Sequence, residues 1–197
     1  MAAAEGSRRS TEAEFMAMTR LSALGPVIHE EHFRMLVLMC GIENRVSGDA
    51  AERPMDPNDE NDRALLEEVV AGLSDMVGHN AFEEAVLFPL LSDGNIGGDD
   101  LSELLGEEHQ IIEPLARRVR TLAAQILEQG VRGSSGKDFQ DAALSLAGNL
   151  IPHLQKEEMA VVQRLGSLLS PDVDRELALS YATECERLAE VYRNRES

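Results

Sequence analysis

Histidine and glutamate recur in this sequence at a spacing that can bind metal ions. Two segments place a histidine four residues before the first of two adjacent glutamates: His79 before Glu83, and His153 before Glu157. Residues four apart on an α-helix differ by roughly 40° in direction, so each pair can chelate one ion. Nitrogen and oxygen ligands without a thiolate suit iron, manganese, zinc or copper and argue against a structural zinc site. Glu84, rotated by roughly 100° from Glu83, is expected to lie outside the site.

These residues belong to an internal repeat. Glu-Glu-His occurs at 30–32 and again at 107–109, and His-x-x-x-Glu-Glu occurs at 79–84 and again at 153–158. The second half of the chain therefore copies the first. Two helices with a chelating pair, facing two helices with one histidine each, would surround a shared centre, as in di-iron and di-manganese carboxylate proteins. The expected ligands are His32, His79, Glu83, His109, His153 and Glu157.

Each piece of this pattern has a simpler interpretation when taken alone. A single His-x-x-x-Glu pair is usually a surface ion pair, and an isolated Glu-Glu-His is usually solvated. Here apolar residues follow the histidines, such as Leu36, Leu87 and Ile112. Four inward-facing histidines without partners would each cost a few kcal/mol, whereas one metal site satisfies all of them. Metal binding is therefore favoured over a metal-free structural bundle.

The breaks in the sequence place these residues on separate helices. Segments rich in glycine, proline, serine and aspartate interrupt stretches with helical apolar periodicity, and no stretch shows the alternation of a β-strand. The expected helices cover residues 11–23, 26–45, 63–91, 101–129, 138–169 and 171–193.

These helices predict an all-α fold, a four-helix up-and-down bundle over residues 24–169. A short helix at 11–23 precedes the bundle, and a helical extension occupies residues 171–197. Residues 1–10 are small and polar and are expected to be disordered.

Composition limits the classes of function. Acidic residues number 36 against 18 basic ones, which gives a formal net charge of −18 and disfavours binding to nucleic acid or to an anionic membrane surface. Hydrophobic residues make up 43% of the chain, enough for a core, but no stretch has the length of a signal peptide core or a membrane span. Cys40 and Cys185 form no disulfide or zinc pattern. We therefore expect a cytoplasmic protein, while the composition leaves its oligomeric state open.

The order of these motifs over about residues 24–168 resembles that of hemerythrin-like domains with the HHE cation-binding pattern. The stretch HNAFEEAVLFPLL, residues 79–91, is the most specific part of the resemblance. Those domains are four-helix bundles that hold two non-haem, usually oxygen-bridged iron ions. The resemblance implies His32, His79, His109 and His153 as ligands and Glu83 and Glu157 as bridges. Oxygen-carrying members place the last carboxylate five residues after the histidine, which makes Glu158 the alternative to Glu157.

Two further residues bear on the function. Oxygen carriers of the family have a second histidine four residues after the third-helix ligand, where this chain has Glu113. We expect Glu113 to be a seventh metal ligand, which would favour the ferric state and weaken reversible oxygen binding. The alternatives are that Glu113 is not a ligand and leaves a position open for chemistry, or that it faces solvent. His29, one turn before His32, could supply the missing imidazole, donate a proton from outside the ligand shell, or lie at the surface.

The leading hypothesis is a di-iron protein that reacts with O2 or peroxide, either as an oxidative enzyme or as a peroxide-consuming protein. The small-molecule substrate stays unspecified, because the fold does not define the pocket. The alternative is a non-catalytic module that binds or senses O2, nitric oxide or iron. A sensor usually acts through an attached domain, and the sequence has only short segments outside the bundle, which favours a stand-alone enzyme or binder.

Overall fold

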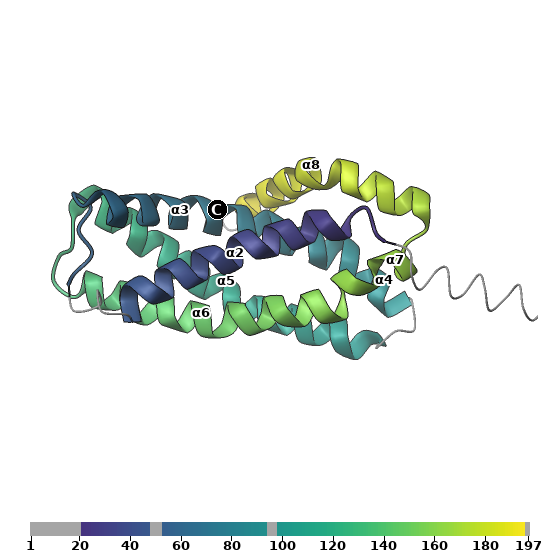
Figure 1. Ribbon diagram of the computed structural model, residues 1–197, viewed down its shortest axis with the longest axis horizontal. Coiled ribbons are helices and arrows are strands. Elements are labelled where there is room, and N and C mark those ends of the chain that lie inside the picture. Colours follow the sequence, from purple (N-terminus) through teal and green to yellow (C-terminus); the bar gives the residue numbers. More distant parts are fainter. Residues whose placement is uncertain (1–20, 48–52, 94–97, 196–197) are drawn as a thin grey trace, which may run out of the picture.

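The computed structural model describes residues 21–47, 53–93 and 98–195, and every regular element in these ranges is helical. The four long helices alternate in direction and form the predicted up-and-down bundle (Figure 1). They are α2 (Gly25–Ser47), α3 (Glu60–Phe82), α5 (Gly98–Gln129) and α6 (Ser135–Ala160). The other elements are η1 (Glu83–Leu87), α4 (Phe88–Asp93), η2 (Val162–Arg164), α7 (Leu165–Leu168) and α8 (Pro171–Arg195). No helix in these ranges is long and apolar enough to cross a bilayer.

Most expected helix ends lie within three residues of the observed ones, but two of the expected helices are not continuous α-helices. The helix expected at 63–91 contains a π-helical turn, η1, and the helix expected at 138–169 ends at Ala160 before the short segments η2 and α7. The expected disorder at 1–10 and most of the helix expected at 11–23 lie outside the described residues. Residues 21–23, the last of that expected helix, are not helical.

The apolar core is divided into two clusters by a polar layer. On α2, α3 and α5, a histidine separates buried apolar side chains of one cluster from those of the other, whereas α6 has Leu150 and Leu154 of the first cluster around His153 and Val161 of the second cluster just after its end. The residues that flank the histidines along the chain include, in the first cluster, Met35, Met76, Ile112 and Leu150. Those in the second are Ile28, Phe82, Leu105 and Val161. Burying such side chains contributes roughly 1.5–3 kcal/mol each, so two apolar clusters hold the histidines at one level of the bundle.

Local contacts fix where α2 ends and α3 begins. The Asp59 side chain accepts hydrogen bonds from the backbone nitrogens of Asn61 and Asp62, which supplies partners for the first turn of α3. Arg45 near the end of α2 donates from Nε to Asp62 Oδ1 over 2.6 Å. This buried ion pair fixes the relative positions of the two helices at the end of the bundle far from α8 (Figure 1).

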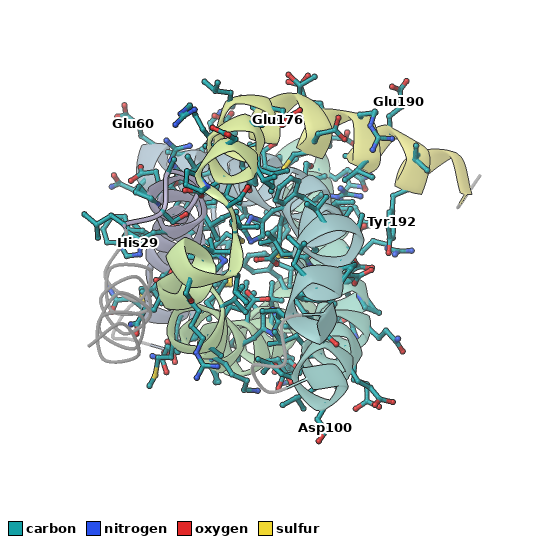
Figure 2. All side chains as sticks on the ribbon, turned by 90° about the vertical axis from the view of Figure 1, so that its right-hand side faces the viewer. His29, Glu60, Asp100, Glu176, Glu190 and Tyr192 are labelled. Carbon is teal, nitrogen blue, oxygen red and sulfur yellow. The ribbon has the colours of Figure 1, made fainter. Side chains whose placement is uncertain are left out.

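The last helix, α8, runs back along the outer side of α3 (Figures 1 and 2). Its first turn is held by buried Asp174, which accepts hydrogen bonds from the Ser22 hydroxyl and from the backbone nitrogens of Ala23 and Leu24. Further along, α8 approaches α3 so closely that a Cβ atom on Gly78 would lie 2.6 Å from the carbonyl oxygen of Cys185. Gly78 precedes His79, so α8 packs directly against the polar layer.

The outer surface of the bundle is strongly acidic. Glu60 on α3, Asp100 on α5, and Glu176 and Glu190 on α8 lie at the outside of the molecule in the view along the bundle (Figure 2). This distribution matches the net charge of −18. Only a small number of acidic residues therefore have a structural role inside the bundle. Most of these lie in or beside the polar layer.

Candidate metal centre

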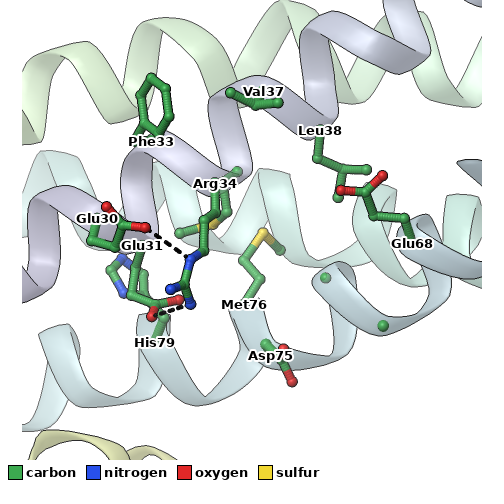
Figure 3. A pocket seen from close by; sticks show the side chains of 13 residues that line it. Glu30, Glu31, Phe33, Arg34, Val37, Leu38, Glu68, Asp75, Met76 and His79 are labelled. Atoms are coloured by element: carbon green, nitrogen blue, oxygen red, sulfur yellow. Dashed lines mark hydrogen bonds and ion pairs between the residues drawn. The ribbon is translucent and has the colours of Figure 1, made fainter.

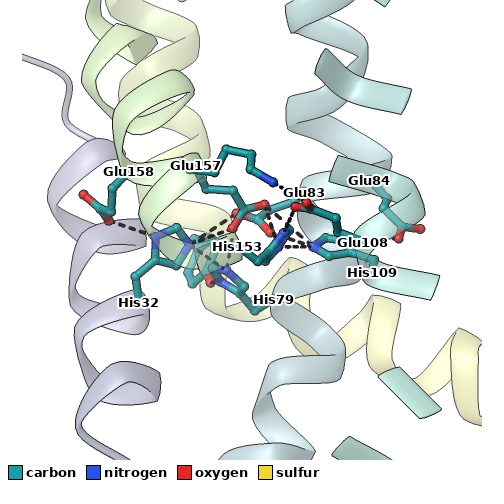
Figure 4. Close-up of polar contacts among 11 residues, drawn as sticks. His32, His79, Glu83, Glu84, Glu108, His109, His153, Glu157 and Glu158 are labelled. Carbon is teal, nitrogen blue, oxygen red and sulfur yellow. Dashed lines mark hydrogen bonds and ion pairs between the residues drawn. The ribbon is translucent and has the colours of Figure 1, made fainter. Parts of the chain in front are cut away.

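The four long helices each bring one histidine into the polar layer. His32 comes from α2, His79 from α3, His109 from α5 and His153 from α6, and none is more than 3% exposed. The rings form two pairs: the Nε2 atoms of His32 and His79 are 3.0 Å apart, and those of His109 and His153 are 2.9 Å apart. All four Nε2 atoms therefore face the bundle centre (Figure 4).

Two buried carboxylates, Glu83 and Glu157, lie between the two histidine pairs. Glu83 Oε1 is 3.3 Å from His79 Nε2 and 3.5 Å from His32 Nε2, while its Oε2 is 3.7 Å from His109 Nε2. Each histidine pair thus meets one oxygen of Glu83.

Glu157 repeats this arrangement from the opposite helix. Its Oε1 is 3.2 Å from His153 Nε2 and 3.7 Å from His109 Nε2, and its Oε2 is 3.5 Å from His32 Nε2. Both carboxylates therefore present one oxygen to each histidine pair, so each half of the centre offers two nitrogens and two oxygens.

Burial and charge act in opposite directions on the protonation of these groups. Desolvation by burial lowers the pKa of His32, but its bonds to Glu158 and Glu83 outweigh burial and raise that pKa to about 10. The pKa of His109 is likewise raised to about 10, by Glu157 and Glu84 against desolvation. Desolvation raises the pKa of Glu83, yet the charges of His79 and His32 hold it well below 4.5. Without a metal ion, the protons held by His32 and His109 therefore offset the negative charge buried at Glu83.

Several carboxylate oxygens of the layer have no hydrogen-bond partner. They are Glu83 Oε2 and both Oε atoms of Glu157, all fully buried. Leaving such oxygens unpaired is costly, and a cation between them would satisfy them. The group His32, His79, Glu83 and Glu157 and the group His109, His153 and Glu157 each gather their ligand atoms closely enough to hold an ion. The donor set therefore fits metal ions.

The second nitrogen of each histidine, Nδ1, contacts a residue outside the layer. Three of these partners are carboxylates and the fourth is a phenol. The Nδ1 contacts are His32 with Glu158 at 2.8 Å, His109 with Glu84 at 3.0 Å, His153 with Glu108 at 2.9 Å and His79 with Tyr181 at 2.6 Å. A partner at Nδ1 fixes the ring and directs Nε2 toward the metal, which is the usual arrangement of metal-binding histidines. Figure 4 shows the three carboxylates around the layer.

This geometry agrees with the comparison with known families. The hemerythrin HHE cation binding domain matches residues 26–165 of the chain. The chain belongs to this family. Comparisons with curated proteins and with solved structures gave no match. The family match spans α2 to the start of α7, so α8 of this hemerythrin-family protein lies outside it.

The structure brings six of the predicted residues of the hemerythrin centre together and leaves Glu113 outside. The six are His32, His79, Glu83, His109, His153 and Glu157. Glu113 is half-buried and lines shallow depressions with Met76 and Tyr192. The reason is its direction: buried Ile112 and Ala116 occupy the inward face of α5, and Glu113 is rotated by about 100° from Ile112.

Two of the alternatives left open by the sequence have distinct places in the structure. Glu157 lies in the layer, whereas Glu158 lies outside it and contacts both His32 and His29. His29 is exposed, and its Nδ1 donates to Glu158 Oε2 over 3.0 Å. His29 is thus outside the ligand shell of the hemerythrin centre and is linked to it through one carboxylate.

Three outer partners were not among the predicted site residues. Glu84 and Glu108 are neighbours of Glu83 and His109, and the doubled glutamates of the repeat are the signal that could have identified them. The expectation that Glu84 lies outside the site is therefore wrong in part, because its side chain reaches His109 on the adjacent helix. Tyr181 lies on α8, and no motif in the sequence relates it to the centre.

A π-helical turn lies at the point where α3 reaches the layer. The backbone nitrogen of Phe88 donates to the carbonyl oxygen of Glu83, five residues earlier, which defines the turn η1. Turns of this kind insert one extra residue into a helix and are frequent at functional sites. Here the first residue of the turn, Glu83, faces the layer. The second residue, Glu84, contacts His109.

A groove of about 360 Å³ between α2 and α3 leads to the layer at His79. Its walls are apolar side chains such as Leu38 and Met76, and Arg34 crosses it near its mouth (Figure 3). Arg34 pairs with Glu30 at 3.2 Å and with Glu31 at 3.3 Å, so its charge is balanced locally. The groove thus brings an apolar opening to one histidine of the layer.

Proposed function

We propose that this hemerythrin-family protein holds two iron ions in the polar layer and reacts with O2 or peroxide. The single observation that supports two ions is the placement of Glu83 and Glu157, whose two oxygens face opposite histidine pairs. A carboxylate that faces two sets of imidazoles is suited to bridging two cations. The proposed ligands are His32, His79, Glu83 and Glu157 on one side, and His109, His153 and the same two glutamates on the other.

The donor set supports iron and a reaction with oxygen species. Two histidines with carboxylate oxygen form the ligand set of non-haem iron sites that use O2, and such sites leave coordination positions open. Because Glu113 is not in the layer, Glu83 and Glu157 are the only carboxylates in the candidate ligand groups formed by residues 21–47, 53–93 and 98–195. Bound iron would supply redox and Lewis-acid chemistry there.

The residues of the chain orient the ligands and restrict access to them. Glu84, Glu108, Glu158 and Tyr181 fix the imidazole rings, and the two apolar clusters exclude bulk water above and below the layer. The groove between α2 and α3 offers a small molecule a route to the half of the centre that contains His79. On the other side of His32, Glu158 and exposed His29 form a hydrogen-bonded path between the layer and the surface.

Two measurements test the proposal. Protein produced with ample iron should contain close to two iron atoms per chain, whereas a result of zinc alone, or of less than about half an equivalent of any transition metal, would contradict it. Stopped-flow mixing of the reduced protein with O2 or hydrogen peroxide should then return the iron to the ferric state. A stable oxygen adduct that disappears under argon would instead favour a non-catalytic O2-binding function. Glu67→Ala, an exposed change on α3, is the matched control.

A further inference from the structure

The outer contacts of the centre follow the internal repeat at two histidines. His32 and His109 occupy equivalent positions in the two Glu-Glu-His segments. Their partners Glu158 and Glu84 are also equivalent, since each is the second glutamate of a His-x-x-x-Glu-Glu segment. Glu158, in the second half of the chain, thus contacts a histidine of the first half, and Glu84, in the first half, contacts a histidine of the second half.

The contact at His79 departs from the repeat. His153 contacts Glu108, which precedes a layer histidine in the sequence. The equivalent partner for His79 would be Glu31, which precedes His32. The structure instead places the Tyr181 hydroxyl at 2.6 Å from His79 Nδ1. A neutral phenol therefore stands where the repeat would place a carboxylate.

The surroundings explain how α8 takes this position. Tyr181 is buried, with its ring against Phe82, and its hydroxyl also bonds to Cys185 one turn later on α8. Glu31 is half-buried and pairs with Arg34 at the groove instead of contacting His79. A tyrosine phenol is neutral near neutral pH, because its ordinary pKa is about 10.

The two kinds of partner affect a bound metal differently. A metal ion on Nε2 requires the imidazole proton on Nδ1, and this Nδ1–H donates to the outer partner. A carboxylate attracts that proton strongly and makes the imidazole a better ligand, whereas a neutral phenol oxygen does so weakly. Glu108 also accepts a hydrogen bond from Lys156.

We propose that Tyr181 is a positioning residue that makes the two halves of the centre unequal. The half containing His109 and His153, with two outer carboxylates, binds the first metal ion. The half containing His32 and His79 binds the second ion more weakly. This inference rests on the proposed function, because it needs one ion in each half. It also assigns a role at the centre to α8, which lies outside the family match.

Anaerobic calorimetric titration with Fe²⁺ tests the inference in the full chain. The unmodified protein should bind in two steps that differ in affinity by about tenfold, the lower end of the effects seen for outer partners. Tyr181→Phe keeps the ring against Phe82 and should weaken only the second step, by about tenfold. Glu84→Gln should weaken the first step, because Glu84 contacts His109. Leu179→Ala, at a position 82% exposed on α8, should leave both steps unchanged.

The outcomes separate this inference from the proposed function. Two steps of equal affinity in the unmodified protein, or equal weakening of both steps by Tyr181→Phe, would overturn the inference and leave the two-ion site in place. Absence of Fe²⁺ binding would overturn both. If Tyr181→Phe fails to fold, as judged by circular dichroism, Glu84→Gln still decides which half binds Fe²⁺ more tightly. A loss of affinity in the second step alone would overturn the assignment of the first ion to the half with His109 and His153.

Discussion

Glu84 Oε1 accepts a hydrogen bond from His109 Nδ1 over 3.0 Å, although the two residues lie on different helices. The neighbouring Glu83 points into the layer, where its Oε2 is 3.7 Å from the other ring nitrogen of His109, Nε2, and its exposed fraction is 1%. The two adjacent glutamates therefore have different places: the Glu83 carboxylate lies within the layer, and the Glu84 carboxylate contacts a histidine from outside it.

The two glutamates should respond differently to substitution. Glu83→Ala removes a carboxylate that faces both halves and should lose most of the iron. Glu84→Ala removes only an outer partner and should lower metal affinity by roughly 10–100-fold while the site still fills at high metal concentration. Metal analysis after dialysis against a weak chelator, compared with Glu67→Ala, would measure this. Equal iron retention by the Glu83 and Glu84 variants would contradict the assignment.

Glu113→Gln should leave the iron content unchanged. The side chain lies beside Met76 and Tyr192 rather than in the layer, so removing its charge takes no ligand from the centre. Iron per chain and the ferric absorption spectrum should match those of the unmodified protein. A loss of about one iron atom per chain would show that Glu113 is a ligand.

The metal-free and metal-loaded proteins should differ in the pH dependence of their stability. The raised pKa values of His32 and His109 mean that their protonation stabilises the folded metal-free protein. This contribution is complete below the usual value of 6.5 and is lost as pH rises through about 10. Metal ions replace those protons, so the loaded protein should not lose stability in this window. Thermal midpoints at several pH values between 6.5 and 10 would test this, and parallel curves for the two forms would contradict it.

Gly78→Ala should weaken the docking of α8. The added Cβ would lie 2.6 Å from the backbone oxygen of Cys185, which cannot rotate away, and we expect a loss of about 1–3 kcal/mol in the free energy of unfolding. Gly148→Ala is the matched control, because nothing lies within 4 Å of its Cβ and alanine favours helix by about 1 kcal/mol. Urea unfolding would compare the two variants. An unchanged midpoint for Gly78→Ala would show that the contact relaxes without cost.

The sequence predicted the part of the centre that depends on local periodicity. His79 with Glu83 and His153 with Glu157 share a helix face because they are four residues apart, and the repeat related one pair to the other. The bundle followed from the same periodicity and from the breaks between helices. These features depend on residues close together in the chain.

The parts that the sequence did not predict depend on long-range contacts. Tyr181 reaches His79 only because Asp174 and Gly78 determine how α8 packs on the bundle, and these contacts join residues about a hundred or more positions apart. The direction of the Glu113 side chain depends on which residues of α5 pack into the core. Spacing alone left both inward and outward directions possible for that residue.

The division of the core by a polar layer has a consequence for the local unfolding of the protein. In the metal-free state, Met35 and Ile28 belong to separate apolar clusters, joined across the layer by protonated imidazoles and carboxylates. Each end of the bundle can then exchange its amide hydrogens as its own cooperative unit. Two ions held by all four long helices would join the two units, so that amides at both ends exchange only through global unfolding.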